Sequence, residues 1–170
     1  MIVAIIVIPL IFIFLYNWIE KPGEEYKIKY FISGVIDEEA LKEETIKVNN
    51  NYVVSVTSVK EDNKNYYDLL QTKGFLDADI LIVNLKDIEN YKDQYDANFF
   101  ALDEAFNNLD VSSYQLLASN NHYYGLIISA SSIWQSEADN QYVLVINKAT
   151  QKSEATIKII HQLLVDEYLK

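Results

Sequence analysis

Two aspartates, Asp77 and Asp79, stand two residues apart at the entrance of an apolar run, residues 80–84. Paired carboxylates can act as general acid and base or bind a hard cation. In an open α/β sheet, however, ligands bind beyond the carboxyl ends of the strands, and these acids stand at the amino end of theirs. We therefore expect a solvated loop here and no catalytic pair.

The carboxyl ends of the predicted strands carry hydroxyl and amide side chains instead. Such groups suit hydrogen bonding to a polar neutral ligand, or they cap the loops that follow the strands. Aromatic rings can add a platform for a sugar or a partner protein, or they can belong to the core. The predicted ligand-binding residues are Ser33, Gly34, Thr57, Ser58, Asn84, Tyr124 and Trp134, with Asn147 as a further polar residue at a strand end.

Several kinds of chemistry have no motif in this chain. It contains no cysteine, which excludes disulfides, thiolate metal sites and thiol nucleophiles. His122 and His161 stand far apart without a supporting ligand pattern. Glycine-rich phosphate loops and the G-x-S-x-G elbow are also missing from the sequence. We predict a protein that is not an enzyme and that has no catalytic residues, no metal and no cofactor.

The net charge of the chain limits the classes of molecule that it could bind. The formal net charge is -11, and all 14 basic residues are lysine. Nucleic-acid binding needs Lys and Arg to neutralise phosphates, so the composition argues against it. It argues equally against docking of the domain on an anionic membrane face.

An apolar segment opens the sequence. Residues 2–19 contain no charged side chain and would span about 27 Å as a helix, close to the hydrocarbon core of a bilayer at about 30 Å. A cleaved signal peptide would need a basic start and a small-residue cleavage site, and neither is present. We predict a transmembrane signal anchor at 1–20, a linker at 21–25 and an extracytoplasmic domain at 26–170. The expected location is the cell membrane, with a single pass and the C-terminal domain outside.

Hydrophobic periodicity predicts that strands and helices alternate in the first half of the domain. Residues 80–84 and 142–147 are apolar on both faces, which is typical of strands in a parallel sheet covered by helices. The predicted fold class is α/β, a three-layer sandwich with a mainly parallel, mixed sheet. The expected strands are 26–33, 52–59, 79–84, 113–118, 123–129 and 142–147, and the expected helices are 37–48, 66–73, 85–91 and 153–168.

Four stretches in this order resemble a known family. They are DADILIVNL at 77–85, FFALDEAF at 99–106, YYGLIIS at 123–129 and YVLVINKATQKSEATIKIIHQLL at 142–164. The pattern is similar to one lobe of the extracellular solute-binding proteins of ABC transporters, which have the type 2 periplasmic-binding fold. In that family the strand ends contact the solute. Family members insert a second lobe after the crossover strand, whereas here only residues 130–141 separate the two strands, so the chain resembles a single-lobe or truncated relative.

The resemblance and the anchor together imply a membrane-anchored binding domain. Its ligand would be a small polar solute, or its partner a transporter subunit or another membrane protein. The alternative is an envelope protein-protein interaction or structural module without a small-molecule ligand. The family resemblance and a shared cleft both require residues 80–83 and 143–146 to lie in one layer and to run in the same direction, because only then do their carboxyl ends meet at one edge.

Overall fold

In the computed structural model of this chain, residues 23–103, 114–128, 134–135, 141–150 and 152–165 are described. The anchor predicted at residues 1–20 lies outside these ranges and stays a prediction. Within the described ranges, no helix has both the length and the apolar character that crossing a membrane requires.

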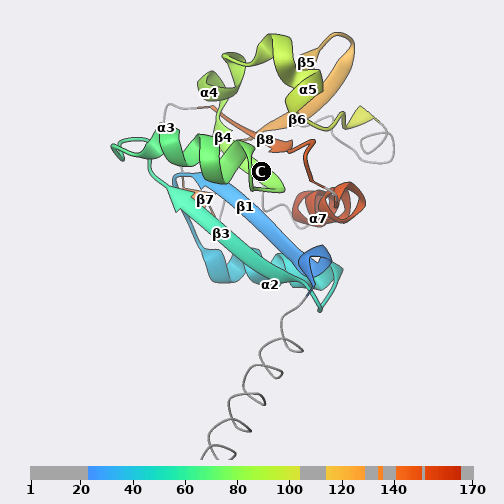
Figure 1. The fold of residues 1–170 in the computed structure, drawn as a ribbon. Helices are drawn as coiled ribbons and strands as arrows, with labels where there is room; N and C mark the ends of the chain where they lie inside the picture. Colours follow the sequence, from blue (N-terminus) through green and yellow to red (C-terminus); the bar gives the residue numbers. More distant parts are fainter. Residues whose placement is uncertain (1–22, 104–113, 129–133, 136–140, 151, 166–170) are drawn as a thin grey trace, which may run out of the picture.

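The domain is built on one six-stranded mixed sheet (Figure 1). The order of strands across it is β3, β1, β4, β8, β6 and β5. Their bounds are Val53–Val59 for β3, Lys27–Ser33 for β1, Ile80–Asn84 for β4, Tyr142–Ile146 for β8, His122–Ile128 for β6 and Gln115–Ser119 for β5. A second, two-stranded sheet pairs β2 (Val35–Ile36) with β7 (Trp134–Gln135). The predicted strands are confirmed within one or two residues.

The direction of β8 differs from the prediction, so the requirement for a cleft shared by the carboxyl ends of β4 and β8 is not met. The strands β3, β1 and β4 are parallel, but β8 is antiparallel to β4, with Ile80 opposite Ile146. The next strand, β6, is antiparallel to β8 and so runs in the direction of β4, and β5 is antiparallel to β6. The sheet is therefore mixed, as predicted, but parallel pairing is confined to its first three strands. An apolar pattern on both faces reports burial on both faces and does not report direction.

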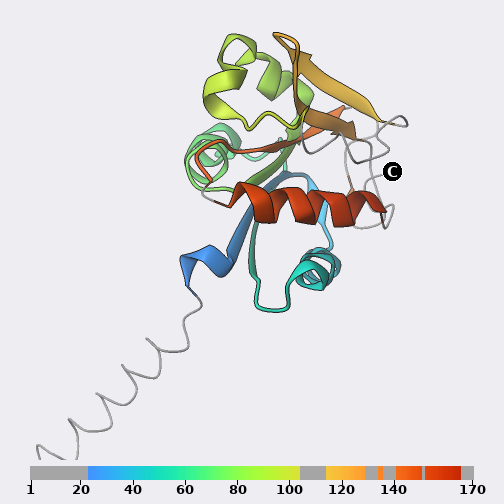
Figure 2. The same ribbon diagram turned by 90° about the vertical axis from the view of Figure 1, so that its right-hand side faces the viewer.

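Helices cover both faces of the sheet, which gives three layers (Figures 1 and 2). One face packs against α2 (Glu38–Val48) and α7 (Ser153–Val165). The other packs against α3 (Tyr66–Leu69), the π-helix η2 (Leu70–Phe75), α4 (Leu85–Glu89) and α5 (Tyr95–Asn98). Two short 3-10 turns complete the described elements, η1 (Glu24–Tyr26) before β1 and η3 (Lys92–Gln94) before α5.

Alternating side chains of the central strands divide the core into two clusters. In β1, Tyr30 and Ile32 face the α2 and α7 side, whereas Phe31 faces the α3 side. All five residues of β4 and of β8 are buried, because each of these strands has a neighbour on both sides and a helical layer on both faces. This arrangement explains the continuous apolar runs in the sequence.

Individual residues in the sequence explain where several helices and strands begin or end. The side chain of Asp37 accepts hydrogen bonds from the N–H groups of Glu39 and Ala40 and so caps α2, as its position predicts. Asn120 and Asn121 have φ values of 50° and 63° and form the tight turn between β5 and β6. Gly34 has a φ of 119°, which turns the chain from β1 into β2 and favours glycine at this position.

The connection between β6 and β8 contains the short strand β7. Within residues 130–141, Trp134 pairs with Ile36 and Gln135 with Val35 in the β2–β7 sheet. The chain therefore leaves β6, pairs with the segment that follows β1, and then enters β8.

Gly125 lies where β6 approaches β8 closely, and its replacement by alanine tests this packing. A Cβ atom at this position would lie 2.5 Å from the Leu144 carbonyl oxygen and 2.8 Å from Val145 Cγ1. We expect Gly125→Ala to lower the free energy of unfolding by about 1–3 kcal/mol, because the backbone of β8 must shift. Urea denaturation of the full chain in detergent, followed by circular dichroism, measures this loss.

The control is Ser55→Ala at an exposed position of β3, which should change the free energy of unfolding by no more than about 0.5 kcal/mol. Equal denaturation midpoints for the two variants would contradict the close packing of β6 on β8.

Candidate functional site

Most of the predicted ligand-binding residues meet at one edge of the sheet. We call the edge where β1, β3 and β4 end the carboxyl edge, and the edge where they begin the amino edge. Five of the seven predicted residues lie at or near the carboxyl edge, namely Ser33, Gly34, Thr57, Ser58 and Asn84. The structure surrounds them with side chains from the next two loops and from the start of β8.

A chain of three hydroxyl and carboxyl groups starts at Ser33. The Ser33 Oγ and the Tyr66 hydroxyl oxygen are 2.6 Å apart, and the Tyr66 hydroxyl donates to Asp87 Oδ2 at 2.7 Å. Because the proton of Tyr66 points to the carboxylate, Ser33 is the donor to Tyr66. All three residues are buried.

A second group of hydrogen bonds converges on Glu61. Its Oε2 accepts from Asn84 Nδ2 at 3.0 Å, and its Oε1 accepts from the Tyr142 hydroxyl at 2.5 Å. The other side-chain atom of Asn84, Oδ1, accepts from the Lys86 N–H at 3.0 Å and caps α4. Asn84 thus joins the end of β4 to the loop that follows β3.

The two carboxylates of this edge lack a cationic partner among the described residues. No lysine in the described ranges lies within ion-pair distance of Glu61 or Asp87. Burial raises the pKa of Asp87 above its usual value of 3.8; hydrogen bonding from Tyr66 lowers it, and the charge of Glu61 raises it. Burial likewise raises the pKa of the Tyr66 hydroxyl, which stays protonated. The site therefore has unneutralised negative charge close to solvent.

An exposed aromatic ring stands beside this charge. Tyr67 is 68% exposed, and its ring meets the ring of Tyr66 edge-on, with centroids 5.2 Å apart and planes at 75°. Hydrogen bonding from Tyr67 also lowers the pKa of Asp87, so its hydroxyl lies near that carboxylate. Prediction from the sequence missed four residues of this site: Glu61, Tyr66, Tyr67 and Asp87. The available signal was the position of the segments at 61–67 and 85–87, directly after two predicted strands.

Three of the predicted residues have structural roles at the rim of this site. The Gly34 N–H donates to the Val59 carbonyl at 2.9 Å, and the Gly34 carbonyl accepts from Ser58 Oγ at 2.7 Å. These contacts hold the ends of β1 and β3 together. Thr57 lies one strand away from Ser33, opposite Phe31 in the register.

The two predicted aromatic residues do not join the site in the same way. Tyr124 is buried at the amino end of β6, where its hydroxyl donates to Asp96, so it lies at the opposite edge of the sheet. The backbone of Trp134 pairs with Ile36, just beyond the carboxyl edge, and its side chain lies outside what the structure describes. The neighbouring Tyr123 is 41% exposed.

The amino edge holds Asp77 and Asp79, the two acids that precede β4. Asp79 is buried, which corrects the expected solvated loop. Its Oδ2 accepts from the Lys29 N–H at 2.9 Å and from Lys152 Nζ at 3.0 Å, and its Oδ1 accepts from Thr150 Oγ1 at 2.5 Å. Lys152 Nζ also donates to the Lys27 carbonyl at 2.5 Å. The carboxylate is buried because the residues after β8 fold over it and satisfy it.

Asp77 behaves as the sequence predicted. It is exposed and pairs with Lys29 Nζ at 2.7 Å, and this contact lowers its pKa. A hollow of about 250 Å³ lies between Asp77, Asp79 and Lys152. Asn147 also lines this hollow and donates to the carbonyls of Phe75 and Ala78. It was expected among the carboxyl-edge residues, but the antiparallel direction of β8 places it at the amino edge.

The described residues contain no cluster of potential metal ligands. In the described ranges, no three His, Asp or Glu side chains gather as a metal site would require. His122 Nδ1 lies 3.0 Å from Asp103 Oδ2 at the exposed start of β6, and His161 is exposed on α7. The carboxyl-edge carboxylates are thus suited to accepting hydrogen bonds from a ligand.

Comparison with known proteins gives only distant neighbours. No protein-family model matches the chain, and no curated protein sequence matches it. Two solved structures are similar to part of it. A de novo designed cysteine esterase has 20% identity over 64% of this chain, with a TM-score of 0.48. The maltose/maltodextrin-binding domain from Bdellovibrio bacteriovorus, bound to maltotriose, has 9% identity over 62% of this chain, with a TM-score of 0.41.

The matched region spans 29% of each of these two proteins. At such low identity and TM-score, neither similarity carries information on function. The expected resemblance to solute-binding proteins is therefore accompanied by one distant structural neighbour of that kind and by no sequence relative.

The unneutralised charge at the carboxyl edge predicts a pH effect on stability. Because the pKa of Asp87 is raised in the folded state, folding favours its protonated form, and this advantage is lost as the pH rises through the folded pKa. We expect the stability of Asp87→Asn relative to the wild type to increase between pH 3 and pH 7. Urea denaturation across this range measures the difference.

Glu154→Gln is a control of opposite sign. The hydrogen bond from Lys158 lowers the pKa of Glu154, so this variant should lose stability relative to the wild type as the pH rises. A pH-independent difference for Asp87→Asn would contradict the proposed burial of an unpaired charge.

The Asp79 contacts predict a large loss of stability on truncation. Asp79→Ala leaves the ammonium of Lys152, whose side chain is only 15% exposed, without its carboxylate. We expect the free energy of unfolding to fall by about 3 kcal/mol or more. The exposed Asp77→Ala is the matched control, with an expected loss below about 1 kcal/mol. Similar losses in urea denaturation for both variants would show that the Asp79 contacts do not stabilise the fold.

Proposed function

We propose that this chain is a membrane-anchored, extracytoplasmic binding domain that captures a small polar solute at its carboxyl edge. The solute would present several ammonium or hydroxyl donors. The observation that carries this proposal is the pair of carboxylates, Glu61 and Asp87, whose hydrogen bonds come from the neutral groups of Tyr66, Asn84 and Tyr142. A ligand with donors would supply the positive charge or the extra hydrogen bonds that these carboxylates lack.

The exposed ring of Tyr67 supports the same type of ligand. An aromatic face next to two carboxylates attracts an ammonium group through its π system and also packs against the apolar face of a sugar ring. The polar groups around it are held in place by their own hydrogen bonds, so little side-chain ordering is needed on binding.

The anchor and the location of the domain are part of the proposal. They are supported by the uncharged segment at residues 2–19 and by the acidic, cysteine-free composition of the rest. A single-lobe domain would bind its solute on an open surface, because the residues between β6 and β8 are too few to form a second lobe. Weak, rapidly reversible binding is the expected consequence.

One observation favours the second candidate, an interaction or structural module without a small ligand. The side chains of Ser33 and Asn84 already have hydrogen-bond partners within the chain, as expected if they only stabilise the loops. A transporter subunit or another membrane protein would then contact the exposed residues of the same edge, of which Tyr67 and Val35 are apolar or aromatic.

Thermal unfolding of the full chain in detergent, with a library of sugars, amino acids, polyamines and short peptides, tests the proposal. A solute that binds only the folded state raises the Tm, and the shift grows with the logarithm of the solute concentration once this exceeds the Kd. We expect at least one donor-rich solute to raise the Tm. Tyr67→Ala should weaken its binding about tenfold, equivalent to about 1.4 kcal/mol.

Tyr123→Ala is the matched control, because Tyr123 is also partly exposed but lies at the start of β6. It should bind as the wild type does. No Tm shift with any member of the library, or equal weakening by the two variants, would contradict the solute proposal and favour the interaction module.

A further inference from the structure

We infer that this domain contacts phospholipid headgroups through the amino edge of its sheet. The inference rests on the proposed anchor. If residues 2–19 span the membrane, three residues (20–22) lie between Ile19 and Gly23, the first described residue. A connection of this length reaches at most about 14 Å. The described chain then passes through η1 into β1 at the amino edge, so this edge is the nearest part of the domain to the bilayer.

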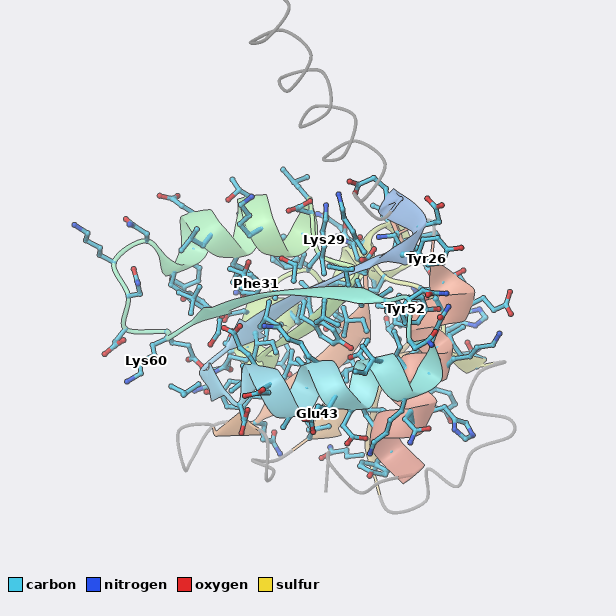
Figure 3. All side chains as sticks on the ribbon, turned by 90° about the horizontal axis from the view of Figure 1, so that it is seen from below. Tyr26, Lys29, Phe31, Glu43, Tyr52 and Lys60 are labelled. Atoms are coloured by element: carbon cyan, nitrogen blue, oxygen red, sulfur yellow. The ribbon has the colours of Figure 1, made fainter. Side chains whose placement is uncertain are left out.

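The residues around this entry point form one continuous surface. We call it the membrane-side surface and define it as residues 24–29, 52–53, 73–79 and 152–158. Lys27 pairs with Val53 across β1 and β3, and Lys29 contacts Asp77. One hollow joins Leu76 to Lys152, and a second joins Glu25 and Tyr52 to the start of α7. In Figure 3, Tyr26 and Tyr52 lie at one end of the two strands, and Lys60 lies at the other.

Three of the seven exposed large hydrophobic residues of the described ranges lie on this surface. Leu76 is 78% exposed, more than any other large hydrophobic residue of the described ranges. Val53, at the start of β3, is 44% exposed, and Tyr26, the last residue of η1, is 37% exposed. A leucine and a tyrosine exposed next to a membrane can insert into the headgroup region, where an amphipathic ring is stable.

The charges of the membrane-side surface are balanced, unlike those of the chain as a whole. Its five acids, Glu24, Glu25, Asp77, Asp79 and Glu154, are matched by five lysines, Lys27, Lys29, Lys73, Lys152 and Lys158. The segments that follow β2, β3 and β4 at the carboxyl edge (residues 37–39, 60–65 and 85–87) carry six acids and three lysines. The amino edge therefore approaches lipid phosphates with the least repulsion, and the acidic edge is turned away from the membrane.

The absence of cysteine from the sequence makes a site-specific test simple. Leu76→Cys and Lys60→Cys, each labelled with an environment-sensitive fluorophore, report on the two ends of the sheet. The full chain is reconstituted into vesicles of phosphatidylcholine and phosphatidylglycerol, with and without a headgroup-attached nitroxide quencher. We expect the nitroxide lipid to quench the label at position 76 at least threefold more strongly than the label at position 60.

Extraction of the same vesicles at alkaline pH separates the inference from the function on which it rests. Release of the protein would overturn the anchor and the inference together. Retention of the protein with equal quenching at positions 76 and 60 would overturn the inference alone and leave the proposed solute binding intact. Leu76 is exposed, so its replacement is not expected to disturb folding.

Discussion

The buried carboxylate of Asp79 is the contact on which the assembly of this fold depends. It stands at the start of β4 and satisfies the N–H of Lys29 in β1, the hydroxyl of Thr150 and the ammonium of Lys152. Lys152 in turn binds the Lys27 carbonyl. Residues that are far apart in the sequence are thereby joined, and the first residues of α7 are held against the first strand. A buried charge with this many partners specifies one arrangement, because any other leaves an ion unpaired.

The same contact explains why the two edges of the sheet differ. The antiparallel direction of β8 brings the residues that follow it to the amino edge, where Thr150 and Lys152 bind Asp79. The carboxyl edge receives the start of β8 instead, which contributes the hydroxyl of Tyr142 and no cation. Charges at the amino edge are therefore paired, whereas those of Glu61 and Asp87 are not. An ion pair stabilises the first edge, whereas Glu61 and Asp87 at the second edge accept hydrogen bonds from neutral groups.

Strand positions and helix starts could be predicted from local patterns, but strand direction could not. The runs at β4 and β8 are both apolar throughout, and nothing in five buried residues distinguishes a parallel from an antiparallel neighbour. Burial of Asp79 was equally hidden, because its partners Thr150 and Lys152 lie about 70 positions later. The pairing of Trp134 with Ile36 has only two residues on each side, too short a signal for periodicity.

Prediction of the candidate site rests on one general rule. The rule that ligands lie beyond the carboxyl ends of parallel strands points to Ser33 and Asn84, and the structure places them in two hydrogen-bonded groups at the same edge. The rule does not identify the side chains that loops and helices bring to that edge. Tyr66 and Asp87 lie on separate helices, and their contact depends on how α3 and α4 pack on the sheet. Chemistry at such an edge is therefore set by tertiary packing, and sequence alone locates the edge without specifying what binds there.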